Sequence, residues 1–119
     1  MKKILILVLI ALLAGCSGNS QVHNVADVTK SETILLKNVS SQPDIYGMVV
    51  IGKGHIDGTA EIVLMLNGKP YKTETLSEDV SFRWSGDWYN DSATIEYKPL
   101  SVRSGNLSLE YEFKNIGVN

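Results

Sequence analysis

The sequence contains one cysteine, so the chain cannot form a disulfide within itself. No apolar run approaches the roughly 20 residues that a transmembrane helix requires, and no segment shows the 3.6-residue period of a long amphipathic helix. These absences exclude a disulfide-stabilised fold and argue against both a membrane-spanning helix and a helical bundle. A chain of 119 residues holds one domain with a modest core.

Positive charge is also scarce, with 11 basic residues against 13 acidic ones. Removal of an N-terminal segment that includes Lys2 and Lys3 would leave 9 basic residues and a net charge of about −4. Proteins that bind nucleic acid carry clustered positive charge. The balance therefore predicts no nucleic-acid partner and no adhesion of the domain itself to anionic lipid.

The N-terminal residues have the pattern of a secretory signal. Lys2 and Lys3 precede an almost wholly aliphatic run over 4–13, and the small residues Ala14 and Gly15 follow it. A positive start, a short apolar run and a small-residue exit are typical of a signal peptide. We expect residues 1–15 to be removed. The alternative, a permanent N-terminal anchor, is disfavoured because polar residues begin at Ser17.

The four residues Leu13-Ala14-Gly15-Cys16 resemble the lipobox of bacterial lipoproteins. The resemblance implies that Cys16 becomes the first mature residue, that its sulfur carries a diacylglycerol and that its amine is acylated. Ser17 does not resemble the aspartate that retains such proteins in the inner membrane. The resemblance therefore implies an outer-membrane lipoprotein on the periplasmic face. It covers the leader alone and identifies no family for the mature domain.

The segment over 16–31 is polar and shows no sustained period, so it is expected to be a flexible tether. His23 lies in this segment and is expected to be solvated. From residue 32 to residue 119 the turn-forming residues are spaced as in a single β domain. Asp57-Gly58 and Asn67-Gly68 are dipeptides favoured in two-residue hairpin turns.

Alternating apolar and polar residues predict about seven short strands, mostly antiparallel because the connections are short. The segments are 33–39, 45–55, 59–67, 70–76, 80–85, 92–98 and 106–114. The expected fold is an all-β, antiparallel β-sandwich of immunoglobulin-like or fibronectin-like architecture. A small closed barrel is the alternative.

The most unusual stretch is "SGDWYND", which places Trp88 and Tyr89 between acidic turn residues. A turn exposes its side chains, and aromatic rings anchor protein partners or stack on sugars. This predicts a partner-binding tip formed by Trp88, Tyr89 and Asp87. The competing interpretation is that Trp88 folds back to cap the core. Asp87, Asn90 and Asp91 are better explained by a turn than by calcium binding, since the EF-hand spacing is missing.

Other candidate chemistry has a structural explanation. In "GKGHIDG", His55 and Asp57 are too few to bind a metal, and the glycines are typical of a bulged strand. Glu96, Glu110 and Glu112 are expected on the wet face of paired strands rather than at a catalytic site. We therefore expect no catalytic residue, no metal site and no cofactor.

The function expected from the sequence is a membrane-anchored, non-enzymatic binding or accessory module for another envelope protein or glycan. One alternative is an inhibitor of an envelope-directed hydrolase, because Ser85-Gly86 followed by Tyr89 is loosely similar to the inhibitory loop of membrane-bound lysozyme inhibitors. An alternative of another class is a glycan hydrolase that uses Asp87 or Asp91 with a glutamate.

Overall fold

The computed structural model describes residues 20–38 and 44–115. The predicted signal peptide and Cys16 lie outside the described residues. The described chain forms five strands: β1 (Gln21–Asn24), β2 (Glu32–Lys37), β3 (Ile45–Leu66), β4 (Lys69–Asp87) and β5 (Ser92–Asn115). All of the pairings among them are antiparallel. No helix in the described ranges is long and apolar enough to cross a membrane.

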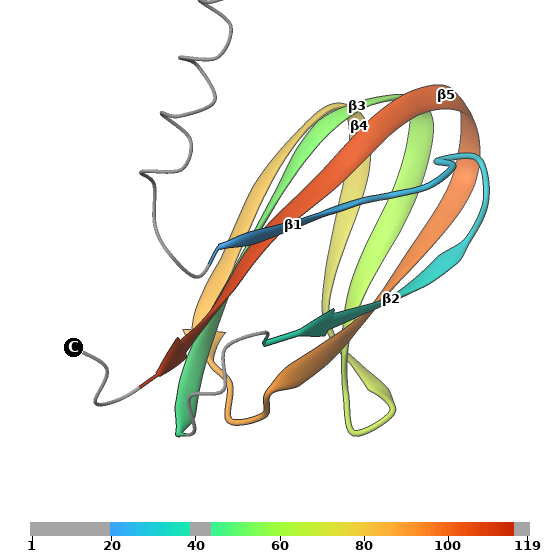
Figure 1. The fold of residues 1–119 in the computed structure, drawn as a ribbon. Coiled ribbons are helices and arrows are strands. Elements are labelled where there is room, and N and C mark those ends of the chain that lie inside the picture. The colour runs from blue at the N-terminus through green and yellow to red at the C-terminus, as the bar shows by residue number, and fades with distance from the viewer. Residues whose placement is uncertain (1–19, 39–43, 116–119) are drawn as a thin grey trace, which may run out of the picture.

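The three long strands bend over together at one end of the molecule, as Figure 1 shows. The spatial order is β1-β5-β3-β4, and β2 pairs with the other half of β5. We call the two parts the β1 half, with 45–56, 78–87 and 105–115, and the β2 half, with 58–66, 69–77 and 92–102. The end opposite the bend is called the open end. It contains the start of β3, the β3–β4 turn and the β4–β5 loop.

The prediction of an all-β antiparallel fold is confirmed, but the predicted number of strands is wrong. Segments 45–55 and 59–67 are one strand, as are 70–76 with 80–85 and 92–98 with 106–114. Pairing continues through the bend, so residues that resemble turns do not end these strands. The sheet has open edges at β4 on one side and at β1 and β2 on the other, which corrects the closed alternative.

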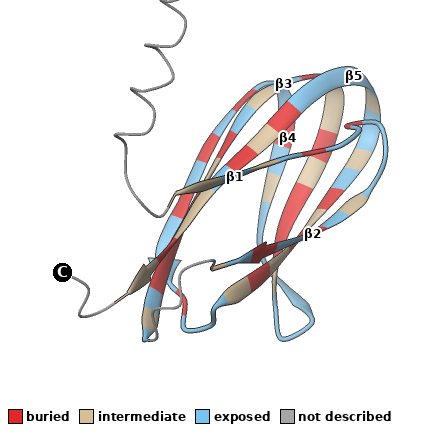
Figure 2. Cartoon of the chain, viewed as in Figure 1, coloured by how far each residue is buried: buried red, intermediate tan, exposed pale blue. Residues whose placement is uncertain are grey.

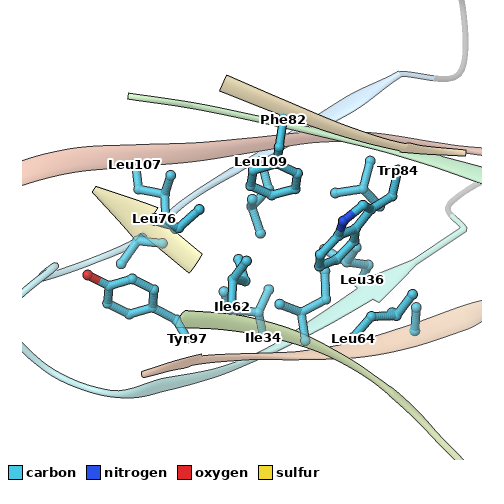
Figure 3. Packing of buried hydrophobic residues seen from close by; sticks show 14 of the residues in the cluster. Ile34, Leu36, Ile62, Leu64, Leu76, Phe82, Trp84, Tyr97, Leu107 and Leu109 are labelled. Atoms are coloured by element: carbon cyan, nitrogen blue, oxygen red, sulfur yellow. The ribbon is translucent and has the colours of Figure 1, made fainter. Parts of the chain in front are cut away.

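One apolar core lies between the two halves. Buried residues alternate with exposed ones along the long strands, as the banding in Figure 2 shows. In Figure 3, Phe82, Trp84 and Leu109 of the β1 half lie across from Ile34, Ile62 and Leu64 of the β2 half. Burial of a side chain of this size contributes about 1.5–3 kcal/mol. Each strand turns one face toward this core, which explains the alternation of apolar and polar residues that the sequence shows.

The segment predicted as a flexible tether is, from residue 20 onward, part of the domain. Strand β1 pairs with β5, and the loop that follows buries Val25 and Val28 to 8% and 4% exposure. The phenol of Tyr97 donates a 2.7 Å hydrogen bond to the carbonyl oxygen of Val28. The polar composition of 16–31 concealed these contacts, because among its described residues, 20–31, only Val25 and Val28 are buried.

Local hydrogen bonds also shape this loop. Asp27 accepts hydrogen bonds from the hydroxyl and the backbone N–H of Thr29, and these bonds lower the pKa of its carboxyl. His23 Nε2 lies 2.9 Å from Glu32 Oε2, and the other carboxylate oxygen of Glu32 accepts a bond from the backbone N–H of Ala26. The prediction that His23 is a solvated tether residue is therefore wrong.

The bend depends on close contact between backbones. Gly58 has φ 137°, and a Cβ atom there would lie 1.7 Å from the carbonyl oxygen of Ser101. Gly105 has φ 138°, and a Cβ atom there would lie 2.2 Å from the carbonyl oxygen of His55. The ladder shifts register between Ile56 and the residues that follow it. The interpretation of "GKGHIDG" as a bulged strand is confirmed, whereas Asp57-Gly58 is not a hairpin turn.

Candidate functional site

Trp88 lies at the open end and is 7% exposed. Its indole N–H donates a 2.9 Å hydrogen bond to the carbonyl oxygen of Ser92, and its backbone N–H donates to the carbonyl oxygen of Tyr46 at 3.1 Å. Both donors of Trp88 are thus satisfied within the domain. The prediction that its ring is exposed is wrong, and the competing interpretation, that Trp88 caps the core, is correct.

Tyr89, the next residue, is 75% exposed. Its exposure agrees with the prediction of an aromatic side chain presented by the loop. Asp87, the last residue of β4, is also exposed. Of the three residues predicted to bind a partner, Tyr89 and Asp87 are therefore accessible and Trp88 is buried.

A second exposed tyrosine lies beside this loop. Tyr71 is 52% exposed, and its ring centroid lies 6.4 Å from that of Trp88 at an interplanar angle of 53°. The ammonium of Lys72 lies 5.9 Å from the Tyr71 ring centroid, within the range of a cation–π contact. The buried indole thus lies close to the accessible phenol ring of Tyr71 on strand β4, and the exposed Tyr89 follows it in the β4–β5 loop.

These residues line a surface hollow of about 290 Å³. Leu66, Tyr71, Trp88 and Tyr89 supply apolar and aromatic surface, and Asp87 and Asn90 supply hydrogen-bonding groups. Binding sites commonly combine a mostly apolar lining with a few polar groups that set orientation. The hollow has this composition and can accept a ring or a small apolar side chain.

The bend in β4 brings the two parts of the hollow together. Tyr71 lies near the first residue of β4, and Trp88 follows its last residue, Asp87. In a straight strand of 19 residues these positions would be about 60 Å apart. Because β4 folds over, both ends lie at the open end of the sheet. The Asn67-Gly68 turn, confirmed by its φ angles of 54° and 77°, reverses the chain between β3 and β4, a few residues before Tyr71.

Tyr71 and Leu66 are functional-site candidates that the sequence analysis missed. Their exposure could have been predicted from the sequence, since both residues lie near the Asn67-Gly68 turn and a turn exposes its neighbours. The turn alone does not place them near Trp88, because proximity depends on the bend.

The other candidate residues are distributed elsewhere. His55 Nδ1 lies 2.8 Å from Asp79 Oδ1, and Asp57 Oδ2 lies 3.3 Å from Arg103. His55 and Asp57 therefore have different partners, and both pairs lie at the bend, far along the sheet from the hollow.

The three glutamates lie on the face of the sheet that points away from the core, but in two different parts of it. Glu96 lies in the β2 half, 3.8 Å from Lys98, whereas Glu110 and Glu112 lie in the β1 half. Glu110 accepts a 2.7 Å hydrogen bond from the hydroxyl of Ser20. The prediction that they lie on a wet sheet face is confirmed, and the bend of β5 separates Glu96 from Glu110 and Glu112 along that face.

Among residues 20–38 and 44–115, no group of three or more His, Cys, Asp or Glu side chains is placed to hold a metal ion. Asp87, Asn90 and Asp91 form part of the β4–β5 loop, where the carbonyl oxygen of Asp91 accepts a 2.9 Å hydrogen bond from the backbone N–H of Asn38. This bond gives Asp91 a structural role in joining the loop to the end of β2.

Comparison with known proteins identifies no family. No family model matches the chain, and no curated protein matches it either. Among solved structures, a de novo designed double-stranded β-helix is similar over 82% of this chain and 100% of its own, with 13% sequence identity and a TM-score of 0.41. At that identity and TM-score the similarity defines no family and no function.

Proposed function

We propose that this protein is a bacterial cell-envelope lipoprotein that binds another envelope protein or glycan without catalysing a reaction. The binding surface is the hollow at the open end, and the lipid anchor is Cys16. The single observation that carries the binding role is the pair of exposed tyrosines, Tyr71 and Tyr89, that line one hollow together with the fixed indole of Trp88.

The anchor part of the proposal rests on the sequence Leu13-Ala14-Gly15-Cys16. The point at which the structured domain begins limits how far such an anchor would let the domain lie from the membrane. Ser20, the first described residue, contacts Glu110, so at most residues 17–19 separate Cys16 from a residue that contacts the domain. Four residue steps span at most about 14 Å of extended chain. A lipidated Cys16 would therefore hold the domain close to the membrane surface, at the periplasmic face of the outer membrane in the proposed assignment.

The binding role is supported by the cost of exposing aromatic surface to water. Large exposed apolar side chains that cluster are typical of interaction sites, whereas single ones are common on any surface. Tyrosine is suited to this role because it has few rotatable bonds, a large apolar ring and a polar hydroxyl. Asp87 and Asn90 at the rim add groups that can accept and donate hydrogen bonds to peptide amides or sugar hydroxyls.

The architecture that supports the site is best interpreted as a small β-sandwich. In this interpretation the two halves of the bent sheet act as its layers, and the hollow lies where the layers separate at the open end. Such a scaffold presents a loop on rigid strands, which lowers the entropy lost on binding.

The hydrolase-inhibitor alternative shares this surface. Ser85 and Gly86 are exposed residues at the end of β4, adjacent in the chain to the loop that carries Tyr89. An inhibitor would insert this loop into the active site of an enzyme such as lysozyme. The two proposals differ in the partner and not in the residues that contact it.

Binding to defined partners tests the proposal. The full-length protein in detergent is immobilised and exposed separately to purified peptidoglycan, to lysozyme and to solubilised outer-membrane proteins. The Tyr71→Ala and Tyr89→Ala variants should each lose most of the captured material. The Leu100→Ala variant is the matched control, because Leu100 is 62% exposed but lies on β5 toward the bend. Equal capture by all three variants would exclude the hollow as the binding surface.

The anchor is tested separately by fractionation. A Cys16→Ser variant should leave the membrane fraction and fail to incorporate labelled palmitate. A variant that stays in the membrane and still incorporates palmitate would contradict lipidation at Cys16.

A further inference from the structure

Strand β4 is the edge of the sheet along its whole length. It pairs with β3 on one side, and no strand within residues 20–38 and 44–115 pairs with its other side. An unpaired edge presents backbone N–H and C=O groups that can pair with another strand. Proteins usually protect such an edge with lysine, proline or a bulge.

The two parts of β4 differ in this protection. The part in the β2 half carries Lys69, Pro70 and Lys72, and the ladder to β3 is irregular between Leu64 and Met65. The part in the β1 half, 79–86, contains no lysine or proline. Its ladder to β3 runs without a register shift from Gly47 to Ile56. This part of β4 therefore pairs regularly with β3 and carries neither lysine nor proline.

Charge on the outer face of 79–86 restricts how two copies of this edge can pair. Asp79, Ser81, Arg83 and Ser85 are exposed, whereas Val80, Phe82 and Trp84 are buried. In an antiparallel pair related by a twofold axis, outward residues lie opposite outward residues. The axis then passes between the two copies of one residue of β4. Residues equally far before and after that residue lie opposite each other, so its choice fixes every pair.

Two registers place opposite charges across from each other, and one of them uses more of the strand. With the axis at Ser85, Arg83 lies opposite Asp87 of the second copy, but only 83–87 can overlap before β4 ends, against 78–84 of the β1 half with the axis at Ser81. With the axis at Ser81, Arg83 lies opposite Asp79 of the second copy, and this opposite-charge pair occurs twice. With the axis at Arg83, two guanidinium groups face each other, and Asp79 faces Asp87. With the axis at Val80 or Phe82, Arg83 faces only serine. Opposite charges across strands stabilise the pairing, and like charges destabilise it.

The groups required for this pairing are accessible. The side chain of Asp79 is 96% exposed, and only its Oδ1 is used by His55. Arg83 forms no ion pair within the described part of the chain. Opposite residues in an antiparallel pair have Cβ atoms about 4.5–5.5 Å apart, which is within reach of an arginine–carboxylate contact.

We propose that the protein forms a twofold dimer in which the 78–84 parts of two β4 strands pair antiparallel about Ser81, with Arg83 of each copy bound to Asp79 of the other. The pairing joins the β1 halves of two copies into one continuous sheet. It leaves the hollow at Tyr71 and Tyr89 on each copy, and β1, which begins at Gln21, lies at the opposite edge of the sheet.

Cysteine crosslinking of the full-length protein in its own membranes tests this register. At the axis, two Ser81→Cys residues have Cα atoms about 4.5–5.5 Å apart, within the range of a disulfide. Mild oxidation should convert Ser81→Cys protein into a covalent dimer of twice the monomer mass. The matched control is Thr73→Cys, an exposed position of the same strand in the β2 half. The unsubstituted protein reports any crosslinking through Cys16.

A charge exchange then tests the contact itself. Adding Arg83→Asp to Ser81→Cys should lower the yield of covalent dimer about tenfold, because two pairs per dimer change sign at about 0.7 kcal/mol each. Adding Asp79→Arg as well should restore the yield. Thermal unfolding followed by tryptophan fluorescence shows that each variant is folded.

Three results would overturn the proposal. The first is a dimer yield for Ser81→Cys no greater than for Thr73→Cys. The second is a yield that Arg83→Asp does not lower or that Asp79→Arg does not restore. The third is a product that contains a different protein in place of a second copy, which would assign the edge to a heterologous strand.

Discussion

The phenol O–H of Tyr97 on β5 donates a 2.7 Å hydrogen bond to the carbonyl oxygen of Val28, 69 residues earlier in the chain. Tyr97 is fully buried, and Val28 is 4% exposed. This bond attaches the 25–31 loop to the core and makes the N-terminal segment part of the domain.

Replacing Tyr97 by phenylalanine should lower the free energy of unfolding by about 1–3 kcal/mol, because the Val28 carbonyl oxygen would be left without its buried donor. Chemical denaturation at neutral pH measures this loss. Tyr89→Phe is the control, and it should change stability little because Tyr89 is exposed. Equal effects of the two substitutions would contradict the role of the bond.

Alkaline pH should weaken the wild-type protein through the same residue. Burial, followed by the nearby charge of Asp27, raises the pKa of Tyr97 above its ordinary value of 10.0. The folded state therefore disfavours the phenolate, and this contribution to stability is complete below pH 10 and is lost as the pH rises through the folded-state pKa. The loss of stability between pH 9 and pH 11, about one unit on either side of that ordinary value, should be smaller in Tyr97→Phe than in the wild type. An identical pH dependence in both proteins would contradict the assignment.

A chain that begins at Ser20 should be markedly more stable than one that begins at Glu32. The shorter chain lacks strand β1 and the buried side chains Val25 and Val28, each of which contributes about 1.5–3 kcal/mol when fully buried. Thermal melts of the two chains compare them directly. Equal melting temperatures would show that residues 20–31 act as a tether after all.

Trp88→Ala should destabilise the domain by about 3–5 kcal/mol, because a buried indole leaves a cavity and its hydrogen bond to Ser92 is lost. Tyr89→Ala should change stability by no more than about 0.5 kcal/mol. Denaturant titrations of both variants test this contrast. A Trp88→Ala protein as stable as the wild type would mean that the indole does not cap the core.

The bend should be intolerant of a side chain at Gly58. Gly58→Ala places a Cβ atom against the Ser101 carbonyl oxygen in a backbone conformation that alanine avoids, and we expect a loss of more than about 3 kcal/mol or failure to fold. Gly86→Ala is the matched control, since nothing lies within 4 Å of the added atom. The measurement is the melting temperature of each variant, and a tolerated Gly58→Ala would contradict the backbone contact.

Local signals in the sequence predicted the parts of the fold that depend on neighbouring residues. The Asn67-Gly68 turn forms because both residues readily adopt positive φ, and the alternation of Val80, Phe82 and Trp84 follows from a strand with one buried face. The similar dipeptide Asp57-Gly58 does not form a hairpin turn, because its conformation is set by close contact with Ser101 on another strand. Nothing within a few residues of Asp57 carries that information.

The candidate site shows the same limit. Exposure of Tyr89 follows from a local turn, but burial of Trp88 depends on the carbonyl oxygens of Tyr46 and Ser92 and on packing against the core. The proximity of Tyr71 requires β4 to fold in half, and that bend is fixed by contacts among three strands.

We propose that the hollow beside Tyr89 binds an envelope partner, and site-specific photocrosslinking in the native host tests this most directly. A photoreactive phenylalanine at Tyr89 should crosslink to one discrete envelope protein or to peptidoglycan, and a Tyr71→Ala substitution in the same chain should reduce that product strongly. The same probe at Leu100, which is also exposed, should give no such product. Equal products from Tyr89 and Leu100, or no product from Tyr89 while the protein is folded in the envelope, would contradict the account.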